Sequence, residues 1–177
     1  MEKIIRLFDR ISKVFGSIAG VMMLIGVTLV LTEIVVRALF DKTLYITEEY
    51  TGYLMVAITF LGLAYTLKEK GHIRMVFLHK VLKGKARILL DIYAFIIGLA
   101  VFTLITITTF NFFWDSVVSQ TRSMQISETY LAIPQSVMPL GSFIVTLQFA
   151  AELLRSILKL RAGDVEEEEV ESGALGR

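Results

Sequence analysis

Residues 47–75 of the chain read TEEYTGYLMVAITFLGLAYTLKEKGHIRM, an uncharged segment between acidic and basic ends. Two acids, Glu48 and Glu49, open the segment, and residues 50–67 then carry no charge. About 20 helical residues, at about 1.5 Å each, cross the roughly 30 Å of hydrocarbon in a bilayer. This run is therefore predicted to be a transmembrane helix with acids at one end and the basic residues of 68–74 at the other.

Three further uncharged runs of similar length occupy residues 14–32, 92–114 and 129–151. Four spans and their short connections use nearly all of the 177 residues, so no separate soluble domain is expected. The predicted fold is an all-α integral membrane protein with four transmembrane helices, which together form a membrane domain of residues 14–161. The expected spans are about residues 14–40, 48–67, 88–114 and 131–155.

The two ends of the chain differ in charge. Residues 1–13 interleave basic and apolar residues at near-helical spacing, which predicts a cytoplasmic, amphipathic lead-in at the membrane surface. A signal peptide is the competing interpretation, although no small-residue cleavage pattern follows the apolar run. Residues 162–177 are acidic and contain glycine, so they are predicted to be a disordered tail.

The Lys and Arg residues that flank the spans predict the orientation, because basic loops stay in the cytoplasm. There are four in the N-terminal segment, two in the first link, seven in the second, one in the third and three at the end of the last span. This alternation predicts that both termini and the middle loop are cytoplasmic.

Four ionisable residues are predicted near the outer boundary of the hydrocarbon: Glu33, Arg37, Glu48 and Glu49. Glu33 and Glu48 each lie about 20 residues from the basic end of their own span, so they are expected at similar depth. Ionisable groups at such positions are costly and are usually paired or functional. Three interpretations stay open. Glu48 or Glu49 reaches Arg37 and pins the first two helices, the group meets a partner subunit or lipid headgroups, or Glu33 couples transport to protons or ions.

One face of the second span carries small and hydroxylated residues at helical spacing. Small residues allow helices to approach closely inside a membrane. The face is predicted to pack against another helix of the chain or against another membrane protein, whereas the opposite side is expected to face lipid or fit a groove. The small face consists of Glu48, Gly52, Met55, Thr59, Gly62 and Thr66, and the opposite side carries Val56, Phe60 and Leu63.

The sequence predicts no catalytic, metal or cofactor site. There is no cysteine, so thiolate ligands and thiol redox chemistry are excluded. His72 and His79, the two histidines, lie in a basic loop and not inside a span, where a haem ligand would be expected. His72 and Arg74 are instead predicted to contact lipid headgroups. Neither an enzyme nor a nucleic-acid-binding protein is therefore expected.

A substrate site of the kind found in secondary transporters is also not predicted. Such sites are built from a pair of spans interrupted by glycine or proline. Here Pro139 and Gly141 interrupt one span only. The chain is therefore typical of an accessory or scaffold subunit.

Several short segments then follow one another along the chain. They are Arg37, Glu48-Glu49, Phe60-Leu61-Gly62 with Ala64, Lys70-Gly71-His72-Ile73-Arg74-Met75, Ile133-Pro134 and Pro139-Leu140-Gly141. Together they resemble the small membrane subunit (DctQ-type) of tripartite ATP-independent periplasmic (TRAP) transporters, over roughly residues 6–160. One departure is that Val76 and Phe77 follow the His-Ile pair where the family often has an aspartate, so no role is assigned to an acid there.

The resemblance implies a scaffold subunit that braces a large multi-span permease subunit of the elevator type. It implies uptake by symport of an organic acid, a carboxylate or a sugar acid, delivered by a periplasmic binding protein. The expected location is a bacterial or archaeal inner membrane, in contact with membrane lipids. The alternative is a self-contained, homo-oligomeric, proton-coupled transporter that uses Glu33.

Overall fold

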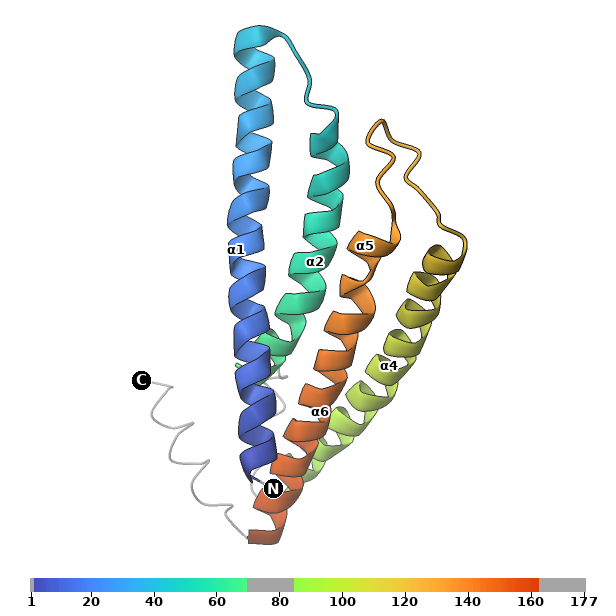
Figure 1. The fold of residues 1–177 in the computed structure, drawn as a ribbon. Helices are drawn as coiled ribbons and strands as arrows, with labels where there is room; N and C mark the ends of the chain where they lie inside the picture. Colours follow the sequence, from blue (N-terminus) through green and yellow to red (C-terminus); the bar gives the residue numbers. More distant parts are fainter. Residues whose placement is uncertain (1, 70–84, 163–177) are drawn as a thin grey trace, which may run out of the picture.

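The computed structural model describes residues 2–69 and 85–162, which fold into helices joined by short links (Figure 1). Four helical segments in these residues are long and apolar enough to cross a membrane. The prediction of an all-α protein with four transmembrane helices is confirmed. The helices are α1 (Glu2–Phe40), α2 (Ile46–Lys68), α4 (Lys85–Val118), α5 (Ala132–Gln135) and α6 (Val137–Ala162).

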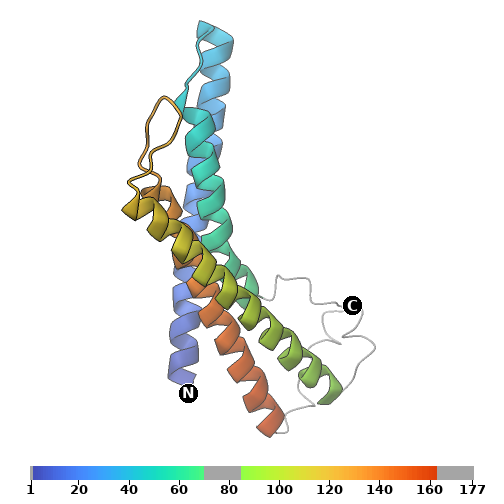
Figure 2. The ribbon, with the colours of Figure 1, turned by 90° about the vertical axis from the view of Figure 1, so that its right-hand side faces the viewer.

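Helix α6 lies at the centre of the bundle and contacts α1, α2 and α4. Helix α1 runs beside α2, and α4 packs against α6 on the other side (Figure 1). Figure 2 shows that α4 crosses the bundle at a marked tilt to α1. We compared the most apolar stretch of each span. Half of its residues are buried inside the protein in the fourth span, which contains α6, against 6% in α1 and 11% in α4. The two outer helices therefore leave most of their surface to lipid or to other proteins.

The first and last described residues, Glu2 and Ala162, lie at the same end of the bundle (Figure 1). We call this the N-terminal end. The links of residues 41–45 and 119–131 lie at the opposite end, which we call the link end. Glu2 and Ala162 thus lie at one end of the four apolar helices that the structure describes, and the prediction that both termini are cytoplasmic stays a prediction.

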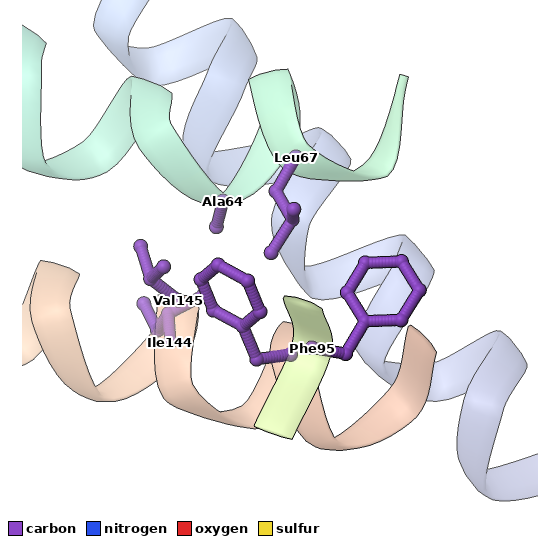
Figure 3. Close-up of a cluster of buried hydrophobic side chains, with 6 residues drawn as sticks. Ala64, Leu67, Phe95, Ile144 and Val145 are labelled. Atoms are coloured by element: carbon purple, nitrogen blue, oxygen red, sulfur yellow. The ribbon is translucent and has the colours of Figure 1, made fainter. Parts of the chain in front are cut away.

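The hydrophobic core forms where α2, α4 and α6 meet (Figure 3). Phe149 of α6 stacks on Phe102 of α4, with ring centroids 5.3 Å apart, and meets Phe95 edge to face at 6.3 Å. Gly98 leaves room for the Phe149 ring, because a Cβ at this position would overlap it. The buried members of the core are Ala64, Leu67, Phe95, Ile144, Val145 and Phe149.

Two boundaries in the described residues differ from those expected. Residues 2–13, expected as a separate lead-in, are the first turns of α1 and continue into the span without a break. Helix α4 continues beyond Trp114 to Val118, and the amide of Ser119 still bonds to the carbonyl of Asp115 at 2.9 Å. The predicted acidic tail beyond residue 162 and the loop with His72 and Arg74 lie outside the described residues.

Both prolines sit where helices tolerate them. Pro134 lies within the short α5, and Pro139 is the third residue of α6. The first amides of a helix have no intrahelical partner, so a missing N–H costs little there. Only Ser136 separates the two helices, and its amide bonds to the carbonyl of Ala132 at 3.0 Å. The fourth span therefore enters the bundle as an almost continuous helix.

Candidate functional site

The carboxylate of Glu33 joins the end of α1 to the start of α2. Its Oε1 accepts a hydrogen bond from Arg37 Nη2 at 2.7 Å. Its Oε2 accepts one from the backbone N–H of Leu44 at 2.7 Å and faces Thr47 Oγ1 at 3.4 Å. The Arg37 side chain is 62% exposed, so its ion pair contributes little, and the bonds to the link are the more important ones. Glu33 thus fixes the turn between the first two spans.

Glu49 is buried at the start of α2, but its partners differ. One oxygen accepts a hydrogen bond from the Tyr53 hydroxyl at 2.5 Å, and the other accepts one from Ser127. The Ser127 hydroxyl also lies 2.9 Å from that of Thr129. Ser127 and Thr129 belong to the link of residues 119–131, so Glu49 attaches this link to α2.

The link itself is held in a hairpin-like shape. The amide of Ser123 bonds to the carbonyl of Thr129 at 2.9 Å, and that of Leu131 bonds to Thr121 at 3.1 Å. Gln120 and Glu128 adopt left-handed backbone angles, with φ of 47° and 46°, at the points where the chain turns. A loop with its own backbone bonds and an anchor on α2 has a defined position at the link end.

The structure therefore separates the acids that the sequence groups together. Arg37 pairs with Glu33, whereas Glu49 points to the 119–131 link and Glu48 is exposed. The expectation that Glu48 or Glu49 reaches Arg37 differs from these contacts. Glu33 and Glu48 were expected at similar depth in the membrane. Thr47, which precedes Glu48 in the chain, lies against Glu33, in agreement with that expectation. Sequence reasoning missed Ser127, because nothing local indicates where the third link folds back.

The small-residue face of α2 is only partly used inside the chain. Gly62 faces Ala19 of α1, and a Cβ added there would lie 3.8 Å from the Ala19 Cβ. Gly52 and Thr59 are exposed. The buried side of α2 is instead formed by Thr47, Glu49, Ala57, Leu61, Ala64 and Leu67. A contact of Gly52 and Thr59 with a partner therefore stays a prediction.

The side chain of Phe60 was expected to face lipid or a groove, and the backbone of this residue lies against α6. A Cβ added to Gly141 would lie 2.7 Å from the backbone carbon and oxygen of Phe60. The lack of a side chain at Gly141 therefore allows α6 to approach the backbone of α2. This contact brings together two of the segments that carry the family resemblance, Phe60-Leu61-Gly62 and Pro139-Leu140-Gly141.

A buried polar network at the N-terminal end was missed from the sequence. Gln148 of α6 accepts from Ser12 at 2.8 Å and donates to Asp9 at 3.1 Å, both on α1. Arg155 donates to Glu152 at 2.7 Å and to Asp9 at 2.8 Å. Ser12, Gln148 and Glu152 are all at most 3% exposed. The signal available was the spacing of Gln148, Glu152 and Arg155 on one face of an otherwise apolar helix.

Hydroxyl groups link α4 to α6 in the middle of the bundle. Thr106 and Thr146 lie 3.2 Å apart, as do Thr109 and Ser142. The Thr106 hydroxyl also donates to the carbonyl of Phe102 in its own helix at 2.7 Å. Such pairs hold helices together where water is absent.

The polar groups of the bundle thus bond to one another and hold helices together. No group of three or more His, Cys, Asp or Glu residues that could bind a metal occurs within residues 2–69 and 85–162. These features define a multi-pass membrane protein whose polar side chains join its helices and links.

A protein-family model described as "Tripartite ATP-independent periplasmic transporters, DctQ component" matches residues 26–159. The match covers most of the chain, which therefore belongs to this family, as its sequence motifs indicated. The family is a transporter component and not a known enzyme family, and a tripartite complex implies a large membrane subunit and a binding protein as partners. No curated protein and no solved structure matches the chain.

Proposed function

We propose that the chain is the small scaffold subunit of a secondary TRAP transporter. It braces a large elevator-type permease subunit, while a periplasmic binding protein delivers an organic acid and an ion gradient drives uptake. The family supports a role in a TRAP transporter. The scaffold role rests on one structural observation, which is how the buried carboxylates are used.

The buried carboxylates Glu33, Glu49 and Glu152 lie toward the ends of the bundle and each accepts hydrogen bonds from side chains of the chain itself. Substrate and ion sites of secondary transporters lie near the middle of the membrane, where polar groups must be free to bind. In the middle of this bundle, Thr106 and Thr109 instead bond to carbonyls of α4 and to hydroxyls of α6. This use of polar groups favours a rigid brace over a carrier.

The homo-oligomeric, proton-coupled alternative needs Glu33 to take up and release protons. In the structure, Glu33 receives hydrogen bonds from Arg37 and from the amide of Leu44, which favour the ionised carboxylate. These bonds support a structural role at the turn between α1 and α2.

Transport into proteoliposomes tests this proposal. We expect no uptake of an organic acid by the chain alone, and uptake driven by an ion gradient when the large subunit and the binding protein are added. Glu33→Gln keeps an acceptor oxygen, so the complex containing this variant should retain most of its uptake. Uptake by the chain alone that is lost in Glu33→Gln would contradict the scaffold role and support the alternative.

A further inference from the structure

The first turns of α1 carry a group of exposed basic side chains. Arg6, Arg10 and Lys13 are exposed, whereas Ile5 and Ser12 face the bundle and are buried. An α-helix turns by about 100° per residue, so the three basic residues lie within an arc of about 60°, which begins about 100° around the helix from Ser12. We call these three residues the basic arc.

The acidic residue next to the basic arc is used inside the bundle. Asp9 accepts hydrogen bonds from Gln148 at 3.1 Å and from Arg155 at 2.8 Å, both on α6. Within the parts of the chain that the structure describes, neither Arg10 nor Lys13 forms an ion pair. Two positive charges at the surface of α1 therefore lack an acidic partner there.

The depth of the basic arc follows from the uncharged part of the first span. Residues 14–32 carry no charge, and at about 1.5 Å per residue this stretch is about 28 Å long, close to the thickness of the hydrocarbon. Lys13 directly precedes the stretch, and Arg10 lies about 4.5 Å further out along the helix. The headgroup layer on each side of the hydrocarbon is about 5–8 Å thick. Lys13 and Arg10 are therefore at the depth of the lipid phosphates, and Arg6 is at the outer edge of this layer.

The spacing of the basic residues suits a phosphate group. Residues three or four apart are neighbours on a helix surface, so Arg10 can share one ligand with Lys13 or with Arg6. A guanidinium donates two parallel hydrogen bonds to phosphate oxygens, and the ammonium of Lys13 adds a second charge. At the link end, by contrast, the exposed Lys42 has the exposed Asp41 beside it. Arg10 and Lys13 therefore match an anionic headgroup in charge, spacing and depth.

We propose that the basic arc binds the headgroup of an anionic phospholipid. Arg10 and Lys13 hold its phosphate, and its acyl chains lie along the exposed apolar surface of α1 that begins at Val14, which is 52% exposed. This inference goes beyond the proposed function, because it concerns the membrane and not the partner subunit. The lipid binds at the end of α1 where Asp9 joins this helix to α6.

Native mass spectrometry of the full chain in detergent tests the proposal. Phosphatidylglycerol, which is anionic, and phosphatidylcholine, whose net charge is zero, are added separately as probes. We expect the wild-type chain to bind phosphatidylglycerol at least about tenfold more tightly, because each basic residue at a membrane surface strengthens the binding of anionic lipid. The double variant Arg10→Gln, Lys13→Gln should lose this preference. Equal binding of the two lipids by the wild-type chain would overturn the proposal.

The matched control is Lys42→Gln, which removes one positive charge from an exposed position at the link end. This variant should keep the preference for phosphatidylglycerol. An equal loss of preference in Lys42→Gln and in the double variant would show that the lipid responds to the overall charge of the chain, and the proposed site would be wrong.

Salt dependence tests the proposal without any substitution. The distance over which charges act falls from about 10 Å at 0.1 M salt to about 3 Å at 1 M. The preference of the wild-type chain for phosphatidylglycerol should therefore fall several-fold over this range. A preference that does not change with salt would contradict the role of Arg10 and Lys13.

Two further results distinguish lipid binding from contacts within the chain. Arg10 and Lys13 are exposed, so the double variant should unfold at the same temperature as the wild type in lipid-free detergent. A lower unfolding temperature would count against the proposal. Binding of phosphatidylglycerol that appears only after removal of the acidic residues 163–177 would identify those residues as the occupant of the basic arc, and would overturn the proposal.

Discussion

At the scale of single residues, two buried glutamates at the link end bind different segments: Glu33 binds the 41–45 link and Glu49 binds the 119–131 link. Glu33 and Arg37 are four residues apart on one helix, so their ion pair could be predicted from the sequence. Glu49 meets Ser127, which is 78 residues away, and this contact could not. Local spacing predicts contacts within a helix, whereas the partner of a residue at a helix end depends on how distant links fold.

Replacing Glu33 by alanine should destabilise the chain. The substitution removes the acceptor for Arg37 and leaves the half-buried amide of Leu44 without its partner, which costs free energy of folding. Glu48→Ala is the control, because Glu48 is exposed in the first turn of α2. We expect a lower unfolding temperature in detergent for Glu33→Ala and an unchanged one for Glu48→Ala. Equal unfolding temperatures for the two variants would refute the role of Glu33 in the turn.

Gly141 should be intolerant of even a methyl group. A Cβ there would lie 2.7 Å from the backbone of Phe60, which cannot move without shifting α2. Gly141→Ala should therefore cost about 1–3 kcal/mol of unfolding free energy. Gly52→Ala is the control, since no atom lies within 4 Å of the added Cβ, and it should be neutral or slightly stabilising. Unfolding in detergent measures the free energy of unfolding of both variants. Similar values for Gly141→Ala and Gly52→Ala would contradict the close approach of α2 and α6.

At the scale of helices, α1 and α6 are joined by a polar network and not by apolar contacts alone. Arg155 lies between Asp9 of α1 and Glu152 of its own helix. Its side chain is 33% exposed, so the ion pairs are partly screened. The buried Glu152 depends on Arg155 and Gln148 as donors, which makes the network sensitive to loss of either one.

Arg155→Ala should cost about 1–3 kcal/mol, because it leaves the carboxylate of Glu152 buried with one weak donor. Adding Glu152→Gln to this variant removes the unpaired charge and should restore part of the stability. A double-mutant cycle in detergent measures the coupling between the two residues. Strictly additive effects would contradict the network.

The link of residues 119–131 should loosen when its anchor is removed. Glu49→Ala deletes the acceptor of Ser127 and Tyr53, so the amides of Ser123 and Leu131 should exchange with solvent several-fold faster. Glu48→Ala should not change them. Hydrogen exchange followed by mass spectrometry measures the exchange rates of these amides in both variants. Unchanged rates in Glu49→Ala would show that the backbone bonds within the link are enough to hold it.

At the scale of the whole molecule, the number of spans was predictable and their packing was not. A long run of apolar residues is more stable in the membrane than in water, and a run of about 20 residues spans the bilayer as a helix. Four such runs therefore identify four transmembrane helices. Lipid and protein interiors are similarly apolar, so hydropathy does not show which face of a helix meets another helix. Gly52 and Leu61 illustrate this, since the small residue expected at a helix contact is exposed, whereas Leu61 is buried. The Asp9, Gln148 and Glu152 network was missed for a related reason, because its partners lie on helices far apart in the sequence.

The large exposed surface of α1 and α4 fits a subunit that works within an assembly. In the most apolar windows of these helices, 6% and 11% of residues are buried inside the protein, so their contacts are left to lipid or partners. A scaffold needs such surface on the outside and fixed contacts within, and the polar groups between the helices supply the latter.

Co-purification from native membranes tests the central claim most directly. The chain would be expressed from its own operon, extracted in mild detergent, and the complex identified by mass spectrometry. A scaffold subunit should bring with it one large membrane protein of many spans in fixed stoichiometry. Recovery of the chain as a homo-oligomer, without such a protein, would contradict the account.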